Sequence, residues 1–214
     1  MEERLRHLIN EINSNLIENY SSIKDIFNNE YGWPELDPVR DEICKCIMFG
    51  LSQAAITLTN HLLESSLKKC LIYKYTIDNK KDIDEKKIET IFKNGIDKFD
   101  NSKSDLSKSI NAACTNGLIT KKQKMILHDF RERFRNSFSH ASSQKTFGDM
   151  KIPAKIINSI DQVDKQINNE ISVKDVPIIQ GIVQSIISSK LCIPYFREVD
   201  EIIREMFLKL DIKR

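Results

Sequence analysis

Apolar residues recur at spacings of three and four along most of the chain, a period that fits an α-helix rather than a strand. The first such stretch extends from about Glu2 to Phe27 and carries Leu5, Leu8, Ile9, Ile12, Leu16 and Ile17. Glycine and proline, which interrupt helices, number only six and five among 214 residues. The pattern predicts an all-α chain whose long helices pack up and down in a bundle.

Turn and capping residues divide this pattern into separate helices. The loop at 31–36 ends the first helix, and Asp37 followed by Pro38 predicts an N-cap and the first position of the next helix. Further along, Gly117 predicts a left-handed helix stop, and Thr120 predicts an N-cap. These signals predict helices over 2–27, 39–75, 86–97, 104–116, the stretch after Thr120, 154–169, 177–188 and 194–210.

The length of the chain suits one domain. We expect 1–214 to form a single all-helical domain, with a core at about 37–143 on which the N-terminal helix and the C-terminal helices pack. The longest apolar stretch, near 47–63, is interrupted by polar residues and falls short of the ~18 apolar residues that span a bilayer, so no membrane partner is expected. Met1 is not followed by a signal region, and the five cysteines are scattered and odd in number, which predicts a cytoplasmic protein with reduced thiols.

The densest chemistry lies in one basic segment. The whole chain has a formal charge of +2, but the stretch from Lys121 to Lys145 holds seven basic and two acidic residues, a surplus of five. Within it, Arg135, Asn136 and His140 supply a fixed cation, a hydrogen-bonding amide and a titratable proton carrier. These groups suit the binding of a phosphodiester and proton transfer at it.

A helix would put these side chains beside a buried stripe. Phe130, Phe134 and Phe138 recur at four-residue spacing, and Arg135 and His140 lie on opposite sides of that stripe, about 140° apart around the helix and ~7.5 Å along it. Long side chains can converge on one ligand from there, and a helix break or a partner chain would make convergence easier. The same spacing also occurs by accident, with Arg135 a surface cation and His140 a residue that interacts with the helix dipole.

The segment resembles the Arg-x(4–6)-His signature of the HEPN superfamily. The match comprises Arg135-Asn136-x-x-x-His140, after Phe130-Arg-x-x-Phe-Arg and before Ala141. The stretch from Asn60 to Lys68 also resembles the central helix of that family, with Glu64 at its acidic position. The resemblance covers about 37–143.

The resemblance implies a helical bundle, often dimeric, that cleaves RNA without a metal in toxin–antitoxin, abortive-infection or other antiphage defence systems. Arg135 and His140 would be the catalytic pair, Asn136 would orient the imidazole or a phosphate oxygen, and Glu64 would be a weaker match to the acidic position. RNA is then the substrate, a homodimer with a composite active site is expected, and an antitoxin or defence-system protein is a possible partner. One alternative is a non-catalytic HEPN-like binding or regulatory subunit, and another is a helical scaffold in which the motif is accidental.

No cofactor or metal is expected. Cys44 and Cys46 would point about 200° apart on a helix, and no second Cys/His pair stands at a suitable spacing. His61 and Glu64, three residues apart, could form a polar pocket with the motif or simply a local hydrogen bond. Trp33 is expected to be a packing anchor rather than a platform for a base.

Overall fold

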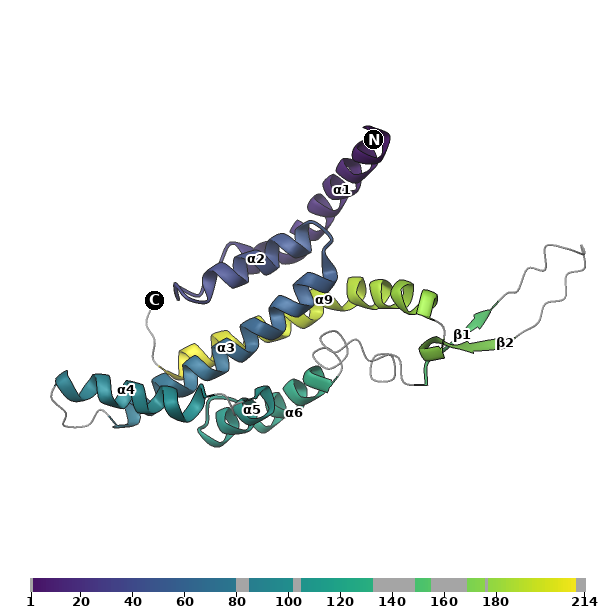
Figure 1. Ribbon diagram of the computed structural model, residues 1–214. Helices are drawn as coiled ribbons and strands as arrows, with labels where there is room; N and C mark the ends of the chain where they lie inside the picture. Colours follow the sequence, from purple (N-terminus) through teal and green to yellow (C-terminus); the bar gives the residue numbers. More distant parts are fainter. Residues whose placement is uncertain are drawn as a thin grey trace, which may run out of the picture.

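The computed structural model describes residues 2–79, 85–101, 105–132, 149–154, 169–175 and 177–210. Its elements form a helical bundle (Figure 1), which confirms the predicted all-α class. In chain order they are α1 (Glu2–Phe27), α2 (Asp37–Met48), α3 (Ser52–Asn79), α4 (Glu85–Phe99), α5 (Leu106–Thr115), α6 (Lys121–Phe130), β1 (Lys151–Ala154), β2 (Asn169–Ser172), the 3-10 turn η2 (Val173–Asp175) and α9 (Pro177–Lys209).

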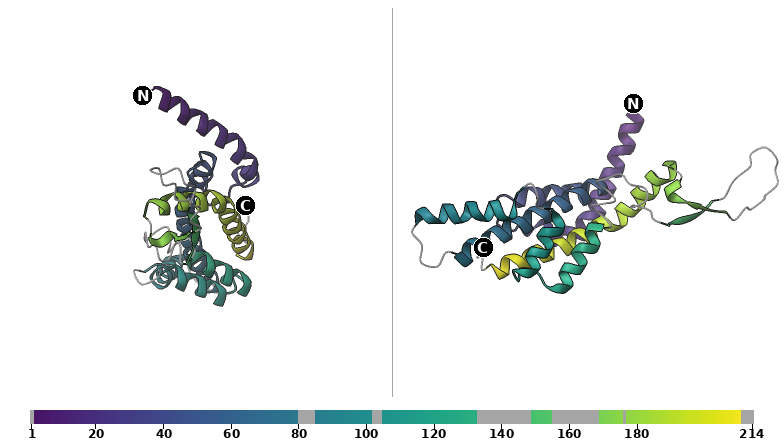
Figure 2. Two further views of the ribbon diagram at one scale, coloured as in Figure 1. Left: turned by 90° about the vertical axis from the view of Figure 1, so that its right-hand side faces the viewer. Right: turned by 60° about the horizontal axis from the view of Figure 1, so that its bottom comes forward.

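The centre of the bundle is formed by α3 and α9, which lie side by side (Figures 1 and 2). α3 also contacts α2, α4 and α5, so it is covered on most sides. Leu63 and Leu67 of α3 and Phe196, Val199 and Ile203 of α9 are fully buried. Within the described ranges, no helix combines the length and apolar content that crossing a membrane requires.

The predicted helix over 39–75 is wrong as a single element, because α2 and α3 are separate. Gly50 ends α2 with φ +76, a backbone conformation that glycine adopts without a steric penalty. The N–H of Leu51 then donates to the carbonyl of Cys46 at 2.8 Å, which satisfies one of the open carbonyls at the helix end. The apolar pattern continues through this turn, and it therefore hid the break.

The start of α2 differs from the prediction by one residue. Leu36 occupies the N-cap position, and Asp37 begins the helix. The Asp37 carboxylate instead accepts hydrogen bonds from the backbone N–H groups of Tyr31 and Trp33, both at 2.7 Å. Asp37 thus fixes the preceding loop, and Trp33 is buried against Tyr73 and Phe207, as expected of a packing anchor.

The C-terminal part corrects two further predictions. Pro194 lies inside the continuous helix α9, where two helices were expected. Buried residues on both sides of it, Cys192 and Phe196 among them, pack into the core, and this packing outweighs the backbone hydrogen bond that proline cannot make. The predicted helix over 154–169 is wrong at both ends: Ala154 and Asn169 are paired in the antiparallel strands β1 and β2, and 155–168 lie outside the described residues.

Candidate functional site

Of the four residues proposed from the sequence, one falls within the described structure. Arg135, Asn136 and His140 lie outside the described residues, whereas Glu64 is on α3. The site is therefore built from two described parts: the helix that leads into the motif, and the surface of α3 that carries Glu64.

The helix leading into the motif is α6, and its start was predicted correctly. Thr120 accepts a hydrogen bond from the N–H of Gln123, and the Gln123 side chain accepts one from the N–H of Thr120, which together form a capping box. Gly117 precedes it with φ +74, the predicted left-handed stop. Lys121 and Lys122 in the first turn are exposed, and the helix continues past Phe130 into a π turn at 131–132.

An aromatic contact anchors the far end of α6. The ring of Phe130 meets the ring of Tyr195 edge-on, with centroids 4.8 Å apart and planes at 79°. Tyr195, on α9, is buried, and its hydroxyl donates to the Asn60 amide oxygen at 2.7 Å. Burial raises the pKa of the Tyr195 hydroxyl, which keeps it a hydrogen-bond donor.

This chain of contacts leads from α6 to the surface with Glu64. Asn60 and Glu64 are four residues apart on α3, so their side chains leave the helix on adjacent turns of one face. The end of α6 is thereby linked through Tyr195 to Asn60, one turn before Glu64 on α3.

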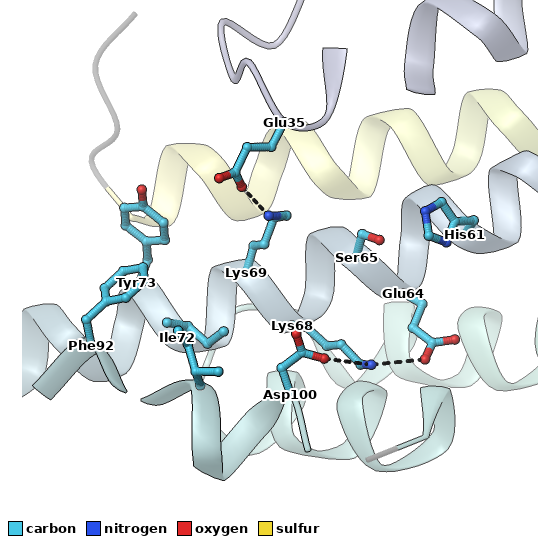
Figure 3. A pocket seen from close by; sticks show the side chains of 11 residues that line it. Glu35, His61, Glu64, Ser65, Lys68, Lys69, Ile72, Tyr73, Phe92 and Asp100 are labelled. Atoms are coloured by element: carbon cyan, nitrogen blue, oxygen red, sulfur yellow. Dashed lines mark hydrogen bonds and ion pairs between the residues drawn. The ribbon is translucent and has the colours of Figure 1, made fainter. Parts of the chain in front are cut away.

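Glu64 lines a surface cavity of about 510 Å³ between α3, α4 and the loop before α2 (Figure 3). The Lys68 ammonium lies between two carboxylates, 3.3 Å from Glu64 Oε1 and 3.0 Å from Asp100 Oδ1. Burial alone would lower the pKa of Lys68, but its hydrogen bonds to Asp100 and Glu64 outweigh burial and raise it. Lys68 therefore stays cationic and fixes the position of the Glu64 carboxylate.

The rest of the cavity combines polar groups with an aromatic wall. His61 and Ser65 of α3 line it beside Glu64, whereas the motif that was expected to complete a polar pocket with His61 and Glu64 lies outside the described residues. Lys69 forms an ion pair with Glu35. The rings of Tyr73 and Phe92 meet edge-on, with their centroids 5.7 Å apart. The complete lining is Glu35, His61, Glu64, Ser65, Lys68, Lys69, Ile72, Tyr73, Phe92, Ile96 and Asp100.

Sequence reasoning missed Lys68 and Asp100. Lys68 follows Glu64 by four residues, a spacing that predicts an ion pair on a helix and could have been used. Asp100 lies just after α4, and no pattern in the sequence brings it to α3. Among the described residues, no group of three or more His, Cys, Asp or Glu side chains is arranged to hold a metal ion.

His128 on α6 is partly buried beside Asn111, with 3.3 Å between its Nε2 and the Asn111 amide oxygen. Burial, together with the positive charges of Arg131 and Lys124, lowers the pKa of His128. The side chain is neutral at pH 7, and it contributes no charge to the basic surface of α6.

Comparison with known proteins adds no family to these observations: a scan of protein-family models, a search of curated proteins and a search of solved structures find no match for the chain.

Proposed function

We propose that the chain is a metal-independent endoribonuclease of the HEPN type, with Arg135 and His140 as its catalytic pair. The observation that carries the proposal is the contact of Phe130 with Tyr195, which fixes the end of α6 near the Glu64 surface. In the sequence, Arg135 follows Glu132, the last described residue after α6, by three residues.

In this mechanism the 2′-hydroxyl of the RNA attacks the adjacent phosphorus and expels the 5′-oxygen of the next nucleotide. His140 moves the proton as general base or acid, and Arg135 neutralises the charge that develops on the phosphorane-like transition state. Asn136 holds the imidazole or a phosphate oxygen. Glu64, already fixed by Lys68, would accept a hydrogen bond from the guanidinium or the imidazole and so orient it.

The charge of the region favours a polyanionic substrate. Lys121 and Lys122 are exposed on the first turn of α6, and further basic residues follow in the sequence up to Lys145. Because the chain as a whole is nearly neutral, RNA would bind to this local surface rather than to the whole molecule.

One Arg–His pair supplies few groups to a phosphodiester, so we propose that two copies form a composite site. A cellular role in a toxin–antitoxin, abortive-infection or other antiphage system would follow, with a partner protein that restrains the nuclease. Mixing wild-type chain with the Arg135→Ala/His140→Ala double variant should lower activity in proportion to the composite sites lost. A monomer by light scattering that still cleaves RNA fully would overturn the shared site.

The deciding experiment incubates the purified chain with mixed RNA in EDTA, beside His140→Ala. We expect cleavage by the wild type, with 2′,3′-cyclic phosphate ends, and a loss of about 10²–10⁴-fold in the variant. His7→Ala is the matched control, because His7 is exposed on α1, away from α6, and its loss should change nothing. Equal cleavage by His140→Ala, a requirement for a divalent ion in the chemical step, or 5′-phosphate products would each contradict the proposal.

A second pair of variants tests Glu64. Glu64→Gln keeps the shape of the side chain but removes the charge that Lys68 pairs with, so cleavage should fall while the fold is retained. Glu89→Gln on the exposed face of α4 is the control. Unchanged cleavage by Glu64→Gln would remove Glu64 from the site and leave the Arg135–His140 assignment in place.

A non-catalytic binding or regulatory subunit is the second candidate, because α1 exposes a row of apolar residues that RNA cleavage does not require. Under this function, wild type and His140→Ala would both lack nuclease activity, and the chain would act through a protein partner.

A further inference from the structure

Six apolar residues and one asparagine of α1 follow a heptad spacing along the helix. Leu5, Ile9, Ile12, Leu16, Asn19, Ile23 and Ile26 succeed one another at alternating spacings of four and three. This is the spacing of the a and d positions that form the seam between two packed helices. Between Leu5 and Ile26 the seam has one polar position, Asn19, whose amide donates to the carbonyl of Ile47 at 2.9 Å.

Only the last turns of this seam are covered. Ile23 and Ile26 are 0% and 5% exposed and belong to the core, whereas Leu5 and Ile9 are 56% and 47% exposed. Both views in Figure 2 show the first part of α1 extending away from the bundle. We call residues 2–18 of α1 the arm.

An arm of this kind needs a partner. A helix of this length without tertiary contacts is marginal in water, because most helical stability in proteins comes from packing of the apolar face. Leu5, Ile9 and Leu16, all exposed, also follow one another along one stripe with Leu8 beside it, which is the usual sign of an interaction surface.

We propose that the arm is a dimerisation surface on which the arm of a second copy packs antiparallel. The order Leu5, Ile9, Ile12, Leu16 is the same in both directions. A two-fold axis midway between Ile9 and Ile12 places Leu5 opposite Leu16 of the second copy and Ile9 opposite its Ile12. Self-complementarity about a two-fold axis is what a symmetric dimer requires.

The residues at the ends of the seam and the position of the helical bundle both favour the antiparallel orientation. Glu2 falls on the seam seven residues before Ile9, and the antiparallel register places it opposite Asn19 of the second copy. A parallel pair would instead face Glu2 with Glu2, two like charges. It would also bring both bundles to the same end, where α1 already packs on α2 and α9.

The area is sufficient for a dimer. Leu5, Leu8, Ile9, Leu16 and Tyr20 are all between 38% and 56% exposed. Covering these side chains and their polar flanks in two copies removes on the order of 1,000 Å² from water, which is the lower limit for a specific interface. This surface lies apart from α6, and the arm pair holds the two bundles at opposite ends. It is therefore a contact separate from the composite site proposed above, and the inference holds whether or not the chain cleaves RNA.

The test uses two variants that add the same charge to the same helix. Ile9→Glu places a carboxylate at the centre of the seam, and Ile17→Glu places one off the seam, at a side chain that is 74% exposed. By sedimentation equilibrium, we expect the wild type and Ile17→Glu to dimerise in the micromolar range, and Ile9→Glu to associate about 100-fold more weakly. Circular dichroism of the three proteins at a concentration where all are monomeric controls for folding.

Orientation is tested by cross-linking. Chains with Leu5→Cys and chains with Leu16→Cys should form a mixed disulfide faster than either forms one with itself, with the wild type as the background for its own cysteines. A wild type that stays monomeric to about 100 μM would overturn the proposal, as would equal dimerisation of Ile9→Glu. Binding of the monomeric chain to lipid vesicles through the arm would assign the stripe to a membrane surface and overturn it as well.

Discussion

The two long helices α1 and α3 carry similar amounts of leucine and isoleucine but lie in opposite environments. α3 is surrounded by α2, α4, α5 and α9, and buries residues on most of its faces. α1 packs mainly through its second half, where the Asn19 amide donates to the carbonyl of Ile47 at 2.9 Å and Ile23 and Ile26 enter the core. The same kind of residue therefore stabilises the monomer on α3 and remains exposed along much of α1.

The difference shows what an apolar pattern does and does not predict. Periodicity identifies which side of a helix will pack, but it carries no information on whether the partner belongs to the same chain. Polar residues tell more about which helix lies inside the bundle. On α3, the buried Asn60 accepts a hydrogen bond from Tyr195, and Glu64 forms an ion pair with Lys68. The most completely packed helix thus also carries the polar residues of the candidate site.

Matched leucine truncations should show the largest difference between the two helices. Leu63→Ala on α3 removes a fully buried side chain and should lower the free energy of unfolding by about 2–5 kcal/mol. Leu5→Ala on the arm should change it by less than about 0.5 kcal/mol when the chain is monomeric. Urea unfolding at low protein concentration measures both, and equal losses would mean that the arm is packed within its own chain.

The next largest loss of stability should come from breaking the hydrogen bond between Tyr195 of α9 and Asn60 of α3. Tyr195→Phe removes the hydroxyl that donates to Asn60 at 2.7 Å and leaves a buried amide oxygen without this donor. We expect a loss of about 1–3 kcal/mol in the free energy of unfolding. The ring contact with Phe130 is kept, so α6 should retain its place. If Tyr195→Phe left the free energy of unfolding unchanged, the hydrogen bond would not stabilise the packing of α3 on α9.

Local signals in the sequence predicted much of the fold. Thr120 and Gly117 mark the start of α6 and the stop before it because capping is chemistry within a few residues. Gly50 and Pro194 were misjudged for the opposite reason. Gly50 breaks a helix whose apolar pattern runs on, and Pro194 is tolerated because contacts with distant residues hold α9 together.

The candidate site divides in the same way. Glu64 was predicted from the resemblance of its helix to the central helix of the HEPN family, and its partner Lys68 obeys a local spacing rule. Asp100 and Tyr195 come from other elements, and only the packing of α4 and α9 on α3 brings them to the site. Arg135, Asn136 and His140 remain predictions from the sequence.

A smaller effect is expected where the arm leaves the bundle. In Gly50→Ala the new methyl carbon would lie 2.5 Å from Nδ2 of Asn15 on α1, which is too close. The alanine would also have to adopt the left-handed backbone conformation of Gly50, which is strained for any residue with a side chain. Gly117→Ala has the same backbone strain, with no atom within 4 Å. We expect a loss of about 1–2 kcal/mol in Gly117→Ala and a slightly larger one in Gly50→Ala, measured by thermal unfolding. An equal loss in the two variants would mean that the Asn15 side chain moves aside without cost.

The smallest effect should come from the ion pair that fastens the packed end of α1 to α9. Asp25 accepts two hydrogen bonds from Arg197, at 2.7 and 2.9 Å, and the hydrogen bonding to Arg197 holds the pKa of Asp25 below its ordinary value of 3.8. A carboxyl group whose pKa is lowered by folding stabilises the folded state at pH values above its ordinary pKa. This stabilisation is lost as the pH falls through the pKa of the folded state. Because the pair is exposed, Asp25→Asn should cost less than about 1 kcal/mol at pH 7. The two proteins should converge in stability below the folded pKa of Asp25. Glu18 is also exposed on α1, so Glu18→Gln controls for a change of charge on the helix. If the stabilities of Asp25→Asn and wild type still differed at the lowest pH, Asp25 would act through packing rather than charge.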